Sequence, residues 1–255
     1  MNPLCQNLAI FDIDGTLLRT SGVDDECYAA ALQERFAIGG ISTDWGTYSH
    51  STDGAILDDL IRERLGRPST DADAELHRSR FVELLERAAR QTPERFSPTP
   101  GAADAIAGLV RHGWMSAIAT GGWRRSALLK LSVAGIDVSD VPAAFADDCR
   151  SREGIIETAI RRALAATPEA AAADHLAKPA PMAPRVVYVG DGPWDLRAAR
   201  RLGIGFVGVG SGDVARRLRA AGAAEVLDRL DPVERLAAAL EQAQPEQRGE
   251  VHASA

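Results

Sequence analysis

The sequence predicts an α/β protein with a parallel sheet as its core and an all-helical unit inserted into that core. Short apolar segments alternate with helical segments in the second half of the chain, which is typical of a parallel sheet covered on both faces. Residues 19–96 instead contain three helical segments with no strand between them. The 255 residues are 45% apolar and 25% charged, so a mainly disordered, collagen-like or coiled-coil architecture is excluded.

The first half of the chain begins with a short buried strand at Asn7–Phe11. Apolar residues at helical spacing then predict helices at Asp24–Phe36, Asp53–Leu65 and Asp71–Arg90. Three prolines between Thr92 and Gly101 mark the exit from this helical unit. We therefore expect a core made of residues 1–18 and 97–241, a helical unit at residues 19–96 and a disordered tail at residues 242–255.

The second half of the chain predicts the rest of the sheet and its covering helices. In chain order we expect a helix at Ala102–His112, a strand at Met115–Ala119, a helix at Arg124–Ala134, a weak strand at Ala143–Ala146, a helix at Arg152–Leu164, a strand at Val186–Val189, a helix at Pro193–Leu202, a strand at Ile204–Val209, a helix at Asp213–Ala220, an edge strand at Glu225–Leu227 and a helix at Pro232–Leu240. The Ala- and Pro-rich stretch Thr167–Pro184 lacks periodicity and predicts a long loop.

Charge and cysteine content indicate the setting of the protein. The formal net charge is −7 and no basic run is present, so we expect no nucleic-acid partner. Three widely spaced cysteines predict neither a disulfide framework nor a zinc site. The sequence shows no signal peptide and no apolar segment near the ~20 residues of a membrane helix. These features favour a cytoplasmic protein without a membrane partner, and they leave the oligomeric state open.

Two carboxylates, Asp12 and Asp14, stand two residues apart directly after the first strand. Asp and Gly also form ordinary turns, so this feature alone leaves two interpretations open. A strand-end Asp can act as a nucleophile that forms an acyl phosphate. A neighbouring carboxylate can give a proton to the leaving alkoxide. Gly15 would let the backbone approach a ligand closely.

Polar residues also follow two later strands, and the carboxyl ends of parallel strands meet at one edge of the sheet. Asp191 and Asp195 lie at the start of the predicted helix at Pro193, where they can favour the helix dipole or bind Mg²⁺. Thr120 and Gly121 precede another helix, where they can cap it or bind phosphate. Four acids at one edge would repel one another without a cation, which favours a Mg²⁺ site.

Together these motifs resemble the haloacid dehalogenase superfamily, in particular its phosphatases with a small α-helical cap. Asp12-Ile13-Asp14-Gly15-Thr16 resembles the first motif, Thr120 the second, and Gly190-Asp191-Gly192 with Asp195 the fourth. The match runs from residue 7 to about residue 230. The resemblance implies a Rossmann-like core and a cap, residues 19–96, that closes over the site and excludes water.

The resemblance also implies catalytic roles for the motif residues. Asp12 would be the nucleophile that attacks the phosphoryl group. Asp14 would first be the general acid for the leaving group and then the base that activates water. Thr120 and the Gly121 amide would hold the transferring oxygens. The dehalogenase branch lacks the second acid of the first motif, so Asp14 favours phosphate chemistry over carbon–halogen cleavage.

By the same resemblance, Mg²⁺ is the implied cofactor. The Asp12 carboxylate, the Asp14 backbone carbonyl and Asp191 would bind it, and Asp195 would support or complete the shell. The implied partner is a small phosphorylated substrate.

The third motif of the family usually contains a lysine, and here the sequence departs from the pattern. The chain has only two lysines among its 29 basic residues. Lys130 lies too early, and Lys178 lies in the Ala- and Pro-rich stretch. Arg152 begins the helix after the third strand, the usual place of this motif, and arginine can contact phosphate in a bidentate manner. We favour Arg152 over Lys178 and Arg150; a solvated helix residue is the alternative interpretation.

The expected function is Mg²⁺-dependent hydrolysis of a small phosphorylated metabolite through an aspartyl-phosphate intermediate. A phosphosugar mutase would use the same residues, and a non-catalytic binding protein would explain the missing lysine. His50 to Asp53 predicts a helix N-cap preceded by a surface histidine. Trp123 and Trp194 flank the predicted site, although either could simply pack in the core.

Overall fold

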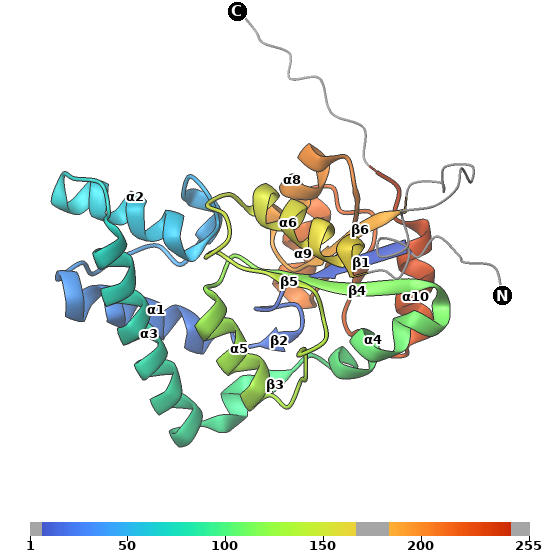
Figure 1. Ribbon diagram of the computed structural model, residues 1–255, viewed down its shortest axis with the longest axis horizontal. Coiled ribbons are helices and arrows are strands. Elements are labelled where there is room, and N and C mark those ends of the chain that lie inside the picture. The colour runs from blue at the N-terminus through green and yellow to red at the C-terminus, as the bar shows by residue number, and fades with distance from the viewer. Residues whose placement is uncertain (1–6, 167–183, 246–255) are drawn as a thin grey trace, which may run out of the picture.

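The computed structural model describes residues 7–166 and 184–245 (Figure 1). Six parallel strands form one sheet in the order β5-β4-β1-β6-β7-β8. These strands are β1 Asn7–Phe11, β4 Trp114–Ala119, β5 Ala143–Ala144, β6 Val186–Gly190, β7 Gly205–Val209 and β8 Val226–Leu227. Helices cover the sheet, so the predicted α/β, Rossmann-like fold class is confirmed.

Strand β1 lies in the middle of the sheet and is buried on both faces. Ala9 and Phe11 pack into one apolar cluster with α4, α5 and α10, and Leu8 and Ile10 pack into a second with α6, α8 and α9. This division follows from the alternation of side chains along a strand. The covering helices are α4 Ala102–Gly108, α5 Arg124–Val133, α6 Arg152–Ala165, α8 Pro193–Leu202, α9 Gly212–Ala220 and α10 Val233–Gln242.

Three further helices form the cap, which lies to one side of the sheet (Figure 1). They are α1 Ser21–Phe36, α2 Asp53–Leu65 and α3 Asp71–Gln91, and they share an apolar cluster with Trp123 at the start of α5. The chain leaves the core at β2 Leu18–Arg19 and returns at β3 Ser97–Pro98, and these two strands pair antiparallel. The division predicted at residues 19 and 96 falls beside these strands and stays a prediction.

Several boundaries differ from the sequence-based expectation. Helix α1 begins at Ser21 rather than Asp24, because its first turn contains Ser and Gly and adds little to the apolar pattern. The helix expected at Ala102–His112 ends its α-helical part at Gly108 and continues as a 3-10 turn, Leu109–His112; glycine is a poor helix former. The expected loop at Thr167–Pro184, with Lys178, and most of the expected tail lie outside the described residues.

The described residues hold two free cysteines, Cys27 and Cys149, whereas Cys5 lies outside them. Within residues 7–166 and 184–245, no helix combines the length and the apolar character that a bilayer crossing requires. The cytoplasmic location stays a prediction.

A histidine is buried inside the cap. The ring of His77 packs against Tyr28, Phe81 and Trp123 and is 0% exposed. Its Nε2 lies 3.1 Å from the carbonyl oxygen of Tyr28, and its Nδ1 has no hydrogen-bond partner among the described residues. Burial lowers the pKa of His77 to about 4, because apolar surroundings disfavour the charged ring.

We expect His77 to make the stability of the protein pH-dependent. Its folded pKa of about 4 lies below the ordinary value of 6.5, so the unfolded chain binds more protons between these values. The free energy of unfolding should therefore fall as the pH drops from 6.5 towards 4, by roughly 3 kcal/mol. Urea unfolding of His77→Leu should show a flatter pH dependence, with His112→Gln as control. Equal slopes for His77→Leu and the natural chain would contradict this.

Candidate active site

Asp12 follows β1 directly and lies at the carboxyl end of the sheet. Its N–H donates to the carbonyl of Val189 in β6, with a distance of 2.9 Å between the two atoms. The residue is therefore held by the pairing of the two central strands, and it is 3% exposed. Burial raises the pKa of Asp12, whereas Arg152 and the hydrogen bond with Thr120 lower it.

The loop after Asp12 is tight and depends on Gly15. The carbonyl of Ile13 accepts the N–H groups of Thr16, Leu17 and Leu18, which folds the chain back on itself. Gly15 has a φ of +79°, and a Cβ at this position would collide with the carboxylate of Asp191. The sequence suggested that Gly15 gives room to a ligand; in the structure it gives room to an acid of the site.

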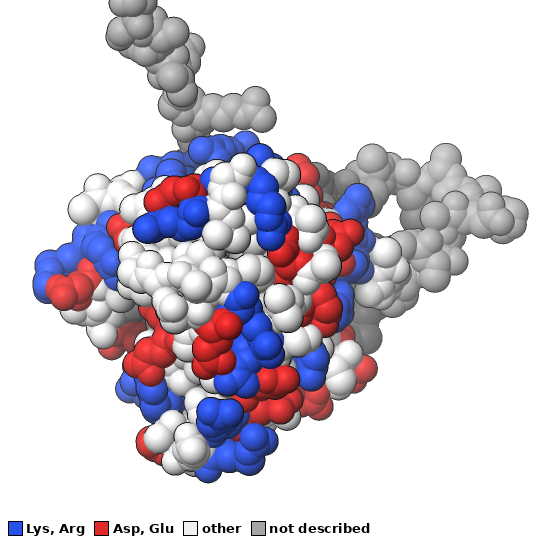
Figure 2. All heavy atoms as spheres, turned by 90° about the vertical axis from the view of Figure 1, so that its left-hand side faces the viewer, with Lys and Arg blue, Asp and Glu red and all other residues white. Residues whose placement is uncertain are grey.

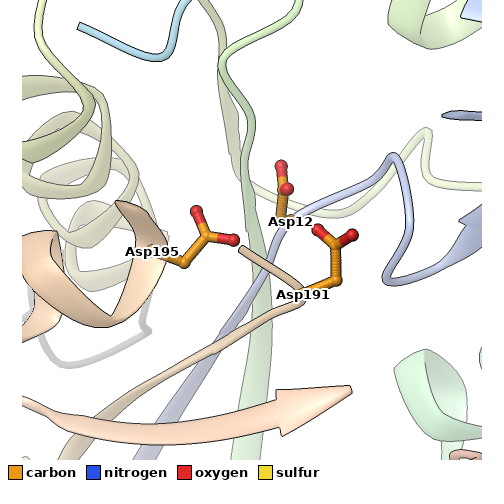
Figure 3. Close-up of side chains that lie close together, drawn as sticks. All are labelled: Asp12, Asp191 and Asp195. Carbon is orange, nitrogen blue, oxygen red and sulfur yellow. The ribbon is translucent and has the colours of Figure 1, made fainter. Parts of the chain in front are cut away.

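Three carboxylates converge beside this loop (Figure 3). Asp12, Asp191 and Asp195 each offer one oxygen, and these three atoms lie within 4.8 Å of one another. Burial and the neighbouring carboxylates raise the pKa of Asp191 well above its ordinary value. Burial likewise raises the pKa of Asp195 to about 7. The three acids were predicted as metal ligands from the sequence, and the structure brings them together.

This group of acids fits a hard divalent cation. Its donors are carboxylate oxygens, which Mg²⁺ prefers. Oδ1 of Asp12 and Oδ1 of Asp195 are buried, and each lies near one cationic atom of the described residues, Nη1 of Arg152, at 3.3 and 3.0 Å. Oδ2 of Asp195 accepts the N–H of Gly192 at 3.0 Å, which fixes this carboxylate in the first turn of α8. A bound cation would offset the cost of burying these charges together.

The carboxylate of Asp14 lies outside this group and makes other contacts. Its Oδ1 accepts a hydrogen bond from the Thr20 hydroxyl at 2.5 Å, and its Oδ2 lies 2.6 Å from Nζ of Lys130. Lys130 also donates to Asp24 of the cap at 2.5 Å. If Asp14 binds a metal, it would do so through its backbone carbonyl, which is the contact that the resemblance implied.

Lys130 lies too early in the sequence to be the cation of the third motif. In the structure it is fully buried in α5. Although burial alone would lower the pKa of Lys130, the carboxylates of Asp14 and Asp24 raise it. A lysine between apolar residues of a helix, here Ala127 and Leu131, was the signal in the sequence: a charge on a buried face requires a partner.

Arg152 lies next to the predicted nucleophile. Its Nη1 is 3.3 Å from Oδ1 of Asp12 and 3.0 Å from Oδ1 of Asp195. Nη1 also donates to the hydroxyl of Tyr188, and Nη2 donates to the carbonyl of Ser51 in the cap segment, both at 3.0 Å. Arg152 therefore supplies a buried positive charge beside Asp12 and contacts the cap at the same time.

The other third-motif candidates lie elsewhere. Nη2 of Arg150 is 2.6 Å from Oδ2 of Asp58 in α2, and its side chain is 52% exposed. The structure therefore places Arg150 at the junction of core and cap and not beside Asp12. Lys178 lies outside the described residues.

The segment after β4 lies where the cap touches the core. Thr120 is buried at the end of the strand, as the sequence predicted for a phosphate ligand. The Gly121 carbonyl accepts the N–H of Asp53 at 2.8 Å, and a Cβ at Gly121 would collide with the Ser51 carbonyl. Gly121 thus allows the cap to approach the core closely.

One residue near the site, Asp53, differs from the sequence-based interpretation. Asp53 is the first residue of α2 and not its N-cap, which is Thr52. Its Oδ2 accepts the N–H of Trp123 at 2.9 Å. Trp123 belongs to the apolar cluster of the cap, whereas Trp194 lines the cavity described next.

A cavity of about 230 Å³ lies between the core and the cap. The predicted site residues that line it are Asp12, Asp14, Thr120, Gly121, Arg152 and Asp191. Cavities for drug-sized ligands occupy roughly 300–1,000 Å³, so this one suits a small molecule. Asp195 lies behind the wall, where it contacts Arg152.

Comparison with known proteins gives the same picture. The model of the haloacid dehalogenase-like hydrolase family matches residues 9–200. A hydrolase from Pseudomonas syringae is 23% identical, with 91% of this chain and 98% of that chain covered and a TM-score of 0.65. A candidate β-phosphoglucomutase from Bacteroides vulgatus is 15% identical, with 96% and 93% covered and a TM-score of 0.64. A predicted phosphoglycolate phosphatase from Haemophilus somnus 129pt is 14% identical, with 92% of this chain and 99% of that chain covered and a TM-score of 0.53.

None of the curated proteins compared with the chain matches it. The structural likenesses fall below 25% identity and therefore establish the fold alone. The family model, in contrast, spans most of the chain and includes all the predicted site residues. The chain belongs to the haloacid dehalogenase-like hydrolase family.

Proposed function

We propose that the protein is a Mg²⁺-dependent phosphohydrolase that acts on a small phosphate monoester through an aspartyl-phosphate intermediate. The observation that supports this most directly is the position of Asp12. This buried carboxylate contacts Arg152 and belongs, with Asp191 and Asp195, to the group of acids that fits a divalent cation. A carboxylate flanked by two positive charges can approach a phosphoryl group that would otherwise repel it.

In the first half of the reaction, a carboxylate oxygen of Asp12 forms a bond to phosphorus as the bond from phosphorus to the ester oxygen breaks. The leaving alkoxide takes a proton from Asp14, whose side chain lines the cavity. Thr20 and Lys130 orient Asp14 through the two hydrogen bonds to its carboxylate.

In the second half, Asp14 takes a proton from a water molecule, and the resulting hydroxide attacks phosphorus. The bond between phosphorus and the Asp12 oxygen breaks, which releases inorganic phosphate and restores the carboxylate. Arg152 and Thr120 line the cavity, and we expect the guanidinium and the hydroxyl to contact the phosphoryl oxygens throughout.

The carboxylates of Asp12 and Asp191 and the carbonyl of Asp14 would hold Mg²⁺, with Asp195 orienting the group from behind. Bound Mg²⁺ would neutralise the charge on the phosphoryl oxygens. Without a cation, these three carboxylates, two buried and one half-buried, would lie together beside a single arginine, which is why we assign the metal to this position.

Replacement of Asp12 tests the nucleophile. We expect Asp12→Asn to reduce phosphate release from an aryl phosphate with Mg²⁺ by roughly 10³-fold or more, because the amide lacks the nucleophilic oxygen. Asp140→Asn, in an exposed turn outside the cavity, is the matched control. Full activity in Asp12→Asn, or no turnover across a broad phosphate-ester panel, would refute the proposal. Isomerised sugar phosphate formed under stimulation by a sugar bisphosphate would indicate a mutase instead.

Thermal unfolding tests the metal site without any turnover. We expect Mg²⁺ to stabilise the natural chain, by about 2.7 kcal/mol at a concentration 100 times the Kd. Asp191→Asn should lose most of this gain, yet its metal-free form should be at least as stable as the natural chain, because one of several repelling charges is gone. An equal Mg²⁺ effect on both proteins would place the metal elsewhere.

Arg152 is tested by comparing two replacements. Arg152→Met leaves Asp12 and Asp195 without their cation, and we expect kcat/KM to fall roughly 10²-fold or more. Arg152→Lys keeps the charge but not the fork that reaches both Tyr188 and Ser51, so it should recover only part of the loss. If Arg152→Met is as active as the natural chain and Lys178→Met is not, the lysine is the phosphate-binding cation.

A further inference from the structure

The wall of the cavity is formed partly by the core and partly by the cap. Its catalytic acids and both of its basic residues, Arg152 and Arg217, come from the core. The cap contributes the remaining charged residues of the wall, and all of them are acidic: Asp24, Asp25, Asp44 and Asp53. The cap side of the wall is therefore acidic.

Only one of these four cap acids has a basic partner among the described residues. Asp24 is paired with Lys130, which Asp14 shares. Within residues 7–166 and 184–245, Asp25, Asp44 and Asp53 form no ion pair with lysine or arginine. Their recorded hydrogen bonds as acceptors come from neutral N–H groups: the indole of Trp45, the amide of Gly46 and the amide of Trp123.

The outside of the cap is different. Acidic and basic side chains alternate over the face shown in Figure 2. Several carboxylates of the cap helices have an arginine partner: Glu26 pairs with Arg95, Glu34 with Arg80, and Asp73 with Arg67, with N–O distances of 2.8, 2.6 and 2.6 Å. These surface acids have arginine partners, whereas Asp25 and Asp53 are half-buried in the cavity wall without one, and a charge is more costly where it is withdrawn from water.

Two of the cavity acids have raised pKa values. Burial raises the pKa of Asp25 to about 6 and that of Asp53 to about 7. A positive charge placed in the cavity would lower both values by direct attraction. A cationic ligand would therefore interact favourably with both carboxylates, whereas a neutral ligand of the same shape would not.

Aromatic rings stand beside these acids. Trp45, Tyr28 and Trp194 line the cavity. The indole N–H of Trp45 donates to Oδ1 of Asp25 at 2.9 Å, and the rings of Trp45 and Tyr28 meet edge to face with centroids 5.5 Å apart. Carboxylates next to aromatic rings are the combination that binds ammonium groups, because both the charge and the ring face attract a cation.

We propose that the substrate is a phosphate monoester of a small alcohol that carries an ammonium group, and that Asp25 and Asp53, with the rings of Trp45 and Tyr28, bind this group. The inference rests on the proposed phosphohydrolase function and adds the substrate class to it. The core end of the cavity binds the phosphate, and the cap end binds the ammonium.

The test compares esters that differ only in charge. Choline phosphate and 3,3-dimethylbutyl phosphate have the same shape, but the second has carbon in place of the quaternary nitrogen. We expect kcat/KM, from phosphate release with Mg²⁺, to be at least roughly tenfold higher for the cationic ester. Ethanolamine phosphate should likewise exceed propyl phosphate, in which carbon replaces the nitrogen. Equal or better turnover of the neutral esters, or of glucose 6-phosphate and glycerol phosphate, would overturn the inference.

Two variants of neighbouring residues in α1 assign the effect to the cavity. Asp25→Asn should reduce the preference for the cationic ester by roughly tenfold, because the amide retains the shape and removes the charge. Glu26→Gln removes one charge from the same turn, but Glu26 faces outwards and pairs with Arg95; its preference should stay that of the natural chain. An unchanged preference in Asp25→Asn would also overturn the inference.

Binding separates this inference from the proposed function. We would measure the Kd of each ester for Asp12→Asn with Mg²⁺ by calorimetry. Tighter binding of the cationic esters without hydrolysis by the natural chain would refute the phosphohydrolase and uphold the ammonium site. Hydrolysis of all esters without any preference in Kd or kcat/KM would refute the ammonium site and uphold the phosphohydrolase.

Discussion

The site depends on buried negative charge that the chain itself compensates only in part. Asp12, Asp191 and Asp195 converge at the carboxyl end of the sheet, and Arg152 is the cation that contacts two of them. Removing one partner from a buried ion pair costs about 3–5 kcal/mol, so the position of Arg152 is strongly determined. The remaining negative charge calls for a second positive charge, and a divalent cation with a phosphate ester can supply the balance.

The same electrostatic constraint couples the cap to the core. Arg152 and Lys130 are the buried arginine and lysine of the described residues, and each contacts both a motif acid and the cap. Arg152 lies against Asp12 and donates to Ser51, while Lys130 lies between Asp14 and Asp24. A displaced cap would leave both cations with fewer partners. The position of the cap and the arrangement of the catalytic acids therefore depend on one another.

The fold class and the grouping of the motif acids could be predicted from the sequence, because buried strands and strand-end acids leave local patterns. Contacts across the cap could not. Lys130 and Asp24 are separated by 106 residues, and nothing local to either residue indicates the other. Gly121 was interpreted as a phosphate ligand, although its lack of a side chain also admits the Ser51 carbonyl. The need for a glycine at this position arises from the contact between the core and the cap, and the spacing of residues along the chain does not reveal that contact.

The distribution of cations also explains why the leaving-group end of the cavity is the place to look for specificity. Both buried cations are engaged by acids of the motifs, and Asp24 shares Lys130 with Asp14. No described basic residue of the cap lines the cavity to neutralise Asp25 or Asp53. The acidic wall of the cap is therefore complementary to a positively charged group, and we expect the substrate to carry that group.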